Sequence, residues 1–62
     1  MTVTCRAIAE ERRAEAIQID SKRTIVYCYS DNELVKEIDC EGKSHYWVSE
    51  CVENWCNGII KE

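Results

Sequence analysis

The clearest periodic pattern lies near the C-terminal end of the sequence. From Trp47 onward the apolar positions are spaced alternately by one and three residues, which is the stripe of an amphipathic helix. Ser44 is a suitable N-cap, Gly58 is a suitable terminator, and Ile59 is placed to fold back on the last turn. The pattern predicts a helix over residues 45–58 with an apolar face formed by Trp47, Val48, Cys51, Val52, Trp55, Cys56 and Ile59.

Two runs in the middle of the sequence predict a β-hairpin. Residues 24–29 are rich in β-branched and aromatic side chains, residues 30–33 form a turn cluster, and the apolar pattern resumes over residues 34–40. A three-residue loop at residues 31–33 would pair Val26 with Ile38. This register places Cys28, Leu34 and Cys40 on one face and Ile25, Tyr27, Tyr29, Val35, Glu37 and Asp39 on the other.

The first twenty residues are compatible with two structures. Ala, Glu and Arg favour a helix there, but a helix would place Arg12 inside an apolar stripe and leave Ile17 outside it. Strands over residues 2–9 and 15–20, joined by a charged loop around residues 11–13, fit better. One strand face would then carry Val3, Cys5, Ala7, Ile17 and Ile19, and the other Thr4, Arg6, Gln18 and Asp20.

Together these elements predict an α+β fold. It is a small two-layer domain in which a four-stranded antiparallel meander has one C-terminal helix packed on one face. The alternative is an N-terminal helix followed by the hairpin and the C-terminal helix. A chain of 62 residues has room for one domain, which we place over residues 1–62.

Five cysteines fall at core-facing positions in this arrangement. Cys5, Cys28 and Cys40 lie on the sheet face that meets the helix, and Cys51 and Cys56 lie on the helix stripe. We interpret them as small buried hydrophobic side chains. Disulfides between the layers and a zinc site are the alternatives, although the cysteine count is odd and no C-x2-C pair occurs. We expect no metal and no cofactor.

The sequence contains no recognisable catalytic motif. His45, the only histidine, lies at the predicted helix start without a cysteine beside it, so a Cys-His dyad is not indicated. Acidic pairs such as Glu37 with Asp39, or Glu50 with Glu53, would need a deep pocket to desolvate one carboxyl group. A domain of this size offers little depth, and we therefore expect no catalytic residues and no enzyme activity.

Overall charge limits the classes of partner. Lys and Arg total 8 against 12 Asp and Glu, a formal net charge of -4. Phosphate backbones and anionic membranes attract cationic surfaces, so we expect no direct binding of nucleic acid and no membrane binding. The N-terminal residues lack the basic and apolar regions of a secretion signal, and we expect a cytoplasmic protein.

The acidic residues are concentrated in the second half of the chain. Residues 1–30 hold five basic and four acidic residues, whereas residues 31–53 hold two basic and seven acidic ones. Such a local negative field attracts cationic protein surfaces, of which nucleic-acid-binding grooves are a common example. The alternative is that the charge only keeps the protein in solution.

The sheet face away from the helix is a second candidate surface. It would display Ile8, Ile25, Tyr27, Tyr29 and Val35, with Arg6, Glu37 and Asp39 at its rim. Aromatic and aliphatic residues inside a charged rim are typical of protein interfaces. The same face would also suit a homodimer seam.

These features predict a small acidic, non-catalytic protein-binding module. We expect it to inhibit or regulate a nucleic-acid-handling protein by docking on a basic surface of that protein. The setting resembles phage or mobile-element counter-defence, such as anti-CRISPR or anti-restriction proteins, by analogy of size and charge alone. The alternatives are a structural domain stabilised by disulfides or zinc and a subunit of an obligate homo-oligomer. The expected partner-binding residues are Tyr27, Tyr29, Asp31, Glu33, Val35, Glu37, Asp39 and Glu41.

Overall fold

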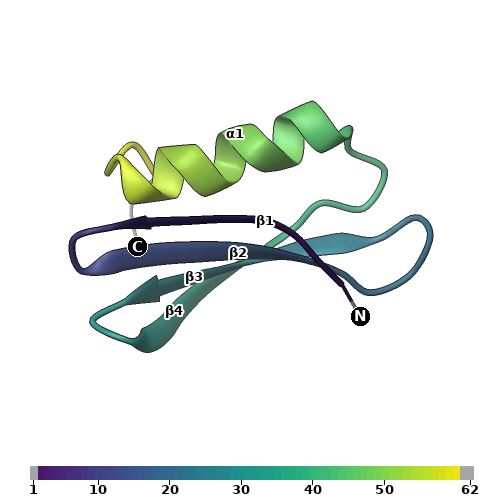
Figure 1. Ribbon diagram of the computed structural model, residues 1–62. Coiled ribbons are helices and arrows are strands. Elements are labelled where there is room, and N and C mark those ends of the chain that lie inside the picture. The colour runs from purple at the N-terminus through teal and green to yellow at the C-terminus, as the bar shows by residue number, and fades with distance from the viewer. Residues whose placement is uncertain (1, 61–62) are drawn as a thin grey trace.

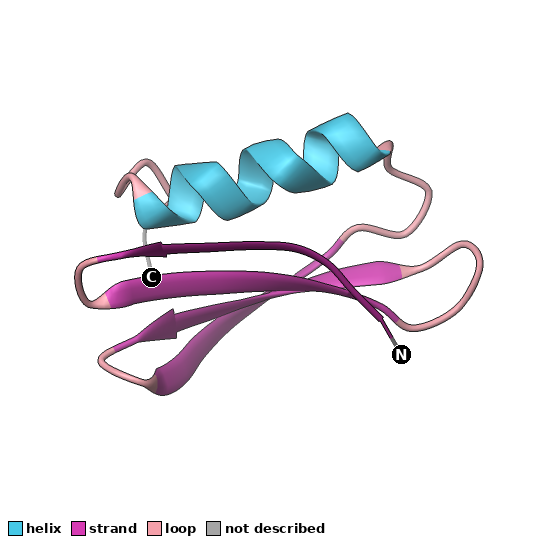
Figure 2. Ribbon diagram, in the orientation of Figure 1, coloured by secondary structure: helices cyan, strands magenta, loops and turns pink. Residues whose placement is uncertain are grey.

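Four strands and one helix form the two layers of the protein (Figures 1 and 2). The structure is a computed structural model that describes residues 2–60, so residues 1, 61 and 62 of the predicted domain lie outside the described residues. The strands form one antiparallel sheet in the order β1-β2-β3-β4, with the helix on one face, which confirms the predicted fold. The alternative N-terminal helix is wrong. The elements are β1 Thr2–Ala9, β2 Arg12–Gln18, β3 Thr24–Ser30, β4 Glu33–Asp39 and α1 His45–Cys56.

Small side chains explain why the N-terminal segment forms strands. Ala14 and Ala16 of β2 are fully buried beneath α1, and Cys5 and Ala7 of β1 pack beside them. Inward alanines let a helix pack closely on a sheet, so tertiary contact outweighs the helix propensity of alanine. β2 also begins at Arg12 rather than at residue 15, because a two-residue turn at residues 10–11 replaces the predicted loop at residues 11–13.

A bulge in β1 corrects the predicted faces of the first hairpin. Thr4 has no partner in the ladder: Val3 pairs with Ile17, and Cys5 already pairs with Ala16. One extra residue inverts the inside-outside alternation of a strand. Val3, predicted to face the helix, therefore lies on the open face. The prediction for its partner Ile17 was wrong for another reason: β2 alternates regularly from the buried Ala14 and Ala16, which places Ile17 on the open face as well.

The second hairpin keeps the predicted pairing of Val26 with Ile38 through a different turn. Asp31 and Asn32 have positive φ angles of 54° and 66° and form a two-residue turn instead of the predicted three-residue loop. An unpaired residue at position 35 restores the register. As a result Leu34 lies opposite Tyr29 on the open face, not on the helix side as predicted.

α1 begins where the sequence predicts. The Ser44 side chain accepts a hydrogen bond from the Trp47 main-chain N–H at 3.2 Å, which is the expected N-cap contact. The buried side of the helix carries Val48, Cys51, Val52 and Trp55. The rest of the predicted stripe is less buried, because Trp47 lies at one margin of this face with 39% of its surface exposed and Cys56 is half-buried.

The helix ends two residues earlier than predicted, in a left-handed C-terminal motif. Gly58, with a φ of 78°, donates its main-chain N–H to the Trp55 carbonyl at 3.2 Å, and Ile59 donates to the Asn54 carbonyl at 2.9 Å. Ile59 was predicted to fold back on the helix, but 65% of its surface is exposed. Ile60 packs against the core in its place.

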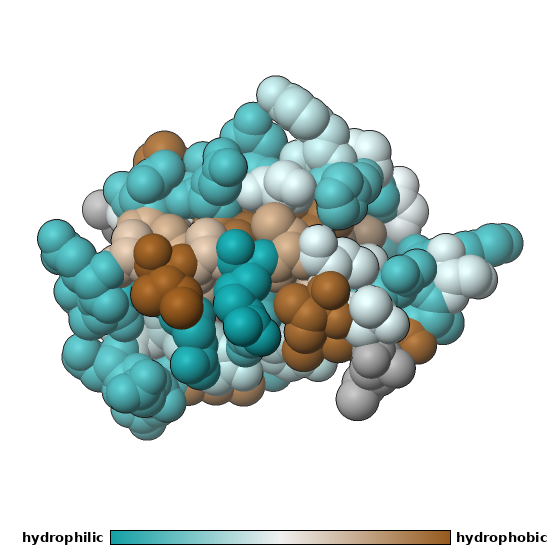
Figure 3. Space-filling view, in the orientation of Figure 1, coloured by the Kyte–Doolittle hydropathy of each residue, from teal (hydrophilic) through white to brown (hydrophobic). Residues whose placement is uncertain are grey.

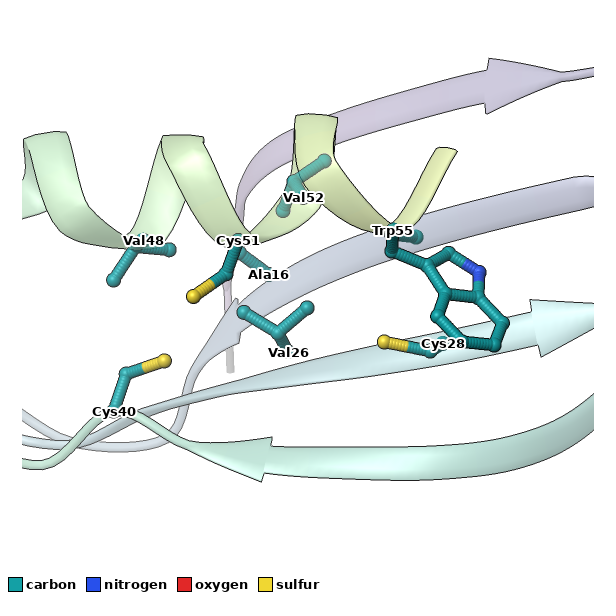
Figure 4. Close-up of a cluster of buried hydrophobic side chains, with 9 residues drawn as sticks. Ala16, Val26, Cys28, Cys40, Val48, Cys51, Val52 and Trp55 are labelled. Carbon is teal, nitrogen blue, oxygen red and sulfur yellow. The ribbon is translucent and has the colours of Figure 1, made fainter. Parts of the chain in front are cut away.

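The hydrophobic core lies between α1 and the sheet (Figure 4). α1 packs over β1, β2 and β3, and β4 extends beyond it as an uncovered edge strand (Figure 1). The helix therefore covers one side of three strands and leaves the whole opposite face of the sheet open. The buried residues are Ala14, Ala16, Val26, Cys28, Cys40, Val48, Cys51, Val52 and Trp55.

Candidate functional site

The acidic residues predicted to bind a partner gather along one edge of the molecule. They lie on β4 and on the turns at its two ends, and β4 has a neighbouring strand on one side only. All of these acidic side chains are exposed, and so is Val35, the apolar residue that lies among them on β4. The set is Asp31, Glu33, Val35, Glu37, Asp39 and Glu41.

The carboxylates flank this edge from both faces of the sheet. Glu37 lies opposite Tyr27 on the open face, and Asp39 follows two residues later on the same face. Glu33 lies opposite Ser30 and therefore on the helix side of the sheet. A partner that reaches only one face of the sheet would not meet all of them, whereas a partner at the edge of β4 would.

The carboxylates differ in how much of their charge is already compensated. Asp39 accepts a hydrogen bond from Arg23 Nη2 at 3.1 Å and another from the Glu41 main-chain N–H at 3.0 Å. Between residues 2 and 60, no side-chain ion pair involves Glu33 or Glu37. Within β4 those two carboxylates are the candidates for contact with an external cation; Asp31 and Glu41, on the flanking turns, likewise form no ion pair in this range.

The two tyrosines of the predicted site are half-buried on the open face. The Arg13 guanidinium group stacks over the Tyr29 ring at 4.3 Å from its centroid, and Glu15, opposite Tyr27, forms an ion pair with Arg6 at 3.1 Å. Sequence reasoning placed Arg13 in a loop and missed this contact. Both tyrosines lie beside charged groups of the chain itself, so a partner would meet them only at their exposed margins.

The open face mixes apolar and charged residues: Val3, Ile17 and Ile25 form one cross-strand row, and the next row begins with Arg6 and Glu15. Ile8 on β1 and Leu34 on β4 expose 68% and 43% of their surface, and Val35 at the β4 bulge exposes 40%. Figure 3 shows separate brown patches with hydrophilic residues between them on the side that it presents. This texture matches a mixed polar and apolar contact surface more closely than a continuous hydrophobic seam.

An arginine and a tryptophan fix the position of α1 on the sheet. Trp55 is fully buried, and its indole Nε1 donates to the Tyr29 carbonyl at 3.1 Å. The Arg12 guanidinium group stacks over the indole at 4.2 Å from its centroid and donates to the carbonyls of Trp55 and Ile60 at 3.1 and 3.0 Å. Sequence reasoning missed this role because it assigned Arg12 to a loop.

Burial suppresses the reactivity of four of the five cysteine thiols. All five are free, and burial raises the pKa of Cys28 and of Cys40 from 9.0 to about 11. Burial also raises the pKa values of Cys51 and Cys56. Since the thiolate is the reactive form, these four groups are held in their unreactive protonated form.

An open depression of about 420 Å³ lies where α1 begins. Lys22 and Lys43 make its rim cationic, His45 borders it, and Cys40 and Val48 reach it from the core side. Cys40 is only 1% exposed, and the pKa of this thiol is raised, so the lone histidine has no thiolate partner here at neutral pH.

Three further findings concern the described residues and known proteins. Across residues 2–60, no three His, Cys, Asp or Glu side chains converge where they could hold a metal ion. Over the same residues no helix has the length and apolar character needed to cross a membrane. Comparison with protein-family models, curated proteins and solved structures finds no match to this chain.

Proposed function

We propose that this protein is a non-catalytic binding module that docks through β4 and its flanking turns on a basic surface of another protein. The observation that carries the proposal is an edge strand left uncovered by the helix, with exposed carboxylates on both of its faces. We further propose that it acts in the cytoplasm as an inhibitor or regulator of a nucleic-acid-handling protein, because such proteins present extended cationic grooves.

Charge and exposed apolar area on β4 would act at different stages of binding. Glu33 and Glu37, which form no ion pair with other residues of the range 2–60, would steer a cationic partner and then meet its Lys or Arg side chains. Leu34 and Val35 supply apolar contact area beside them. Steering accounts for fast and salt-sensitive association, and the apolar contact slows dissociation.

The charges on β4 favour a cationic partner over a second copy of the same strand. Antiparallel pairing of two β4 strands about their centre would place Glu33 of one copy opposite Asp39 of the other and Lys36 opposite Lys36. Like charges directly opposite each other destabilise a strand pair. This is a common way to protect an exposed edge from self-association.

The proposal is tested with two variants of equal net charge. Glu33→Lys/Glu37→Lys removes the two β4 carboxylates that form no ion pair within residues 2–60, and the control Glu50→Lys/Glu53→Lys changes two exposed acids of α1. The probe is a fluorescent deca-arginine peptide, titrated at low and high salt, with its contact site mapped by amide chemical shifts. We expect salt-sensitive binding to wild type, with the largest shifts in residues 31–39.

The two variants separate a docking site from overall charge. The β4 variant should bind the peptide about tenfold more weakly than wild type, since each exposed charge contributes up to about 1 kcal/mol, whereas the control should lose less than about threefold. Equal losses in the two variants, or chemical shifts spread evenly over the molecule, would show that the acidity serves only solubility.

A further inference from the structure

Two thiols from distant parts of the chain face each other in the core. Cys40 directly follows β4, and Cys51 lies in the middle of α1. In Figure 4 their sulfur atoms point toward each other across the space between sheet and helix. Both side chains belong to the same buried core cluster. Cys28 lies farther along the core, close to Trp55 in the same view.

Both thiols are buried, with 1% of Cys40 and 8% of Cys51 exposed, but only one of them borders a surface depression. Cys40 lines the depression at the start of α1, whereas Cys51 does not. The lysines at the rim, Lys22 and Lys43, would attract a small anionic reagent into this depression. A reagent held in the depression would approach the pair from the side of Cys40, because Cys40 borders the depression and Cys51 does not.

We propose that Cys40 and Cys51 form an intramolecular disulfide by exchange with a small anionic disulfide such as oxidised glutathione. In the first step the Cys40 thiolate attacks one glutathione sulfur. The S–S bond of glutathione breaks, and the departing glutathione thiolate takes up a proton. In the second step the Cys51 thiolate attacks the Cys40 sulfur of this mixed disulfide and expels the second glutathione. Overall two protein thiols are oxidised, and one glutathione disulfide is reduced to two thiols.

The exchange should depend on pH. Burial raises the pKa of both thiols, so the reactive thiolate forms rarely at neutral pH and more often as the pH rises. The bond would tie the segment between β4 and α1 to the middle of the helix. Cys28 is buried and Cys5 and Cys56 are half-buried, and we expect none of these three to bridge to Cys40 or Cys51.

A protease that cleaves after glutamate tests the pairing directly, because each of the five cysteines then lies in a different peptide. Cys40 falls in peptide 38–41, Cys51 in 51–53 and Cys56 in 54–62. The protein is incubated with oxidised glutathione at mildly alkaline pH, alkylated under denaturing conditions and digested. We expect peptides 38–41 and 51–53 joined, with a mass two hydrogens below their sum, and the other three cysteines alkylated.

Two variants control for the choice of partner thiol. Cys56→Ser should leave the bridge intact, because Cys56 lies on the same helix but outside the pair. Cys51→Ser should stop at the mixed disulfide, leaving glutathione on Cys40. The proposal is overturned if the wild-type digest joins peptide 38–41 to any other cysteine peptide, or if Cys40 and Cys51 are both alkylated after prolonged exchange. The wild-type digest decides between these outcomes even if a variant fails to fold.

Discussion

Replacing Arg12 by methionine should remove the contact that holds the end of α1 on the sheet. The change deletes hydrogen bonds of 3.1 and 3.0 Å to the carbonyls of Trp55 and Ile60 and the cation over the indole ring, while it keeps most of the apolar stem. A hydrogen bond from a half-buried charged donor contributes about 1 kcal/mol, and the stacking contributes about as much again. The favourable charge at the helix C-terminus adds about 0.5 kcal/mol. We expect the free energy of unfolding to fall by about 3.5 kcal/mol, a large share of the stability of so small a domain.

Arg13→Met is the matched control, because Arg13 is the next residue of the same strand and faces the opposite side. It stacks on Tyr29 but leaves its buried Nε without a hydrogen-bond partner, so its removal should cost less than about 1 kcal/mol. Urea unfolding followed by circular dichroism should show the midpoint lowered by roughly 2 to 3 M in Arg12→Met. Arg12→Lys should be intermediate, because one ammonium group replaces a planar donor that reaches two carbonyls. Equal midpoints for the Arg12→Met and Arg13→Met proteins would refute this account.

Three further predictions concern the core, a turn and pH. Trp55→Phe should lower the free energy of unfolding in urea by about 2 kcal/mol, because it leaves a cavity and removes the donor that lies 3.1 Å from the Tyr29 carbonyl. The control Trp47→Phe, at a more exposed position, should lower it by less than about 0.5 kcal/mol. Gly58→Ala should lower the free energy of unfolding by about 1 kcal/mol, because the φ of 78° strains any residue with a Cβ atom. No atom would clash with the new methyl group, so the loss comes from the backbone alone, and Gly58→Asn should recover part of it. An unchanged melting temperature for Gly58→Ala would contradict this explanation. The raised pKa values of Cys28 and Cys40, from 9.0 to about 11, mean that the unfolded chain releases these protons first. Stability should therefore be constant below about pH 8 and fall between pH 9 and 11, by up to roughly 2 to 3 kcal/mol per thiol. Urea midpoints measured across this range should fall less steeply for Cys28→Ala than for wild type, and parallel curves would count against the thiol origin.

The elements predicted correctly from the sequence are those governed by local signals. The start of α1 follows from Ser44, and its buried face follows from a spacing that only a helix brings to one side. The pairing of Val26 with Ile38 follows from the turn cluster between two β-branched runs, and it survives the shorter turn because the β4 bulge compensates. The acidity of the candidate site is likewise a property of the composition of residues 31–53.

The arrangement of the site depends on contacts between segments that are distant in sequence. A bulge forms where two strands must stay paired, so its position at Thr4 depends on β2 as much as on β1, and it reversed the predicted face of Val3. Arg12 could be assigned to the sheet only once Trp55 and Ile60 were placed beside it. The sequence by itself determined two things: the two-layer α+β fold and the concentration of acidic residues in one stretch of the chain. Only tertiary packing decided that β4 is the strand the helix leaves uncovered, because one helix of this length covers three strands and the chain places β4 at the edge.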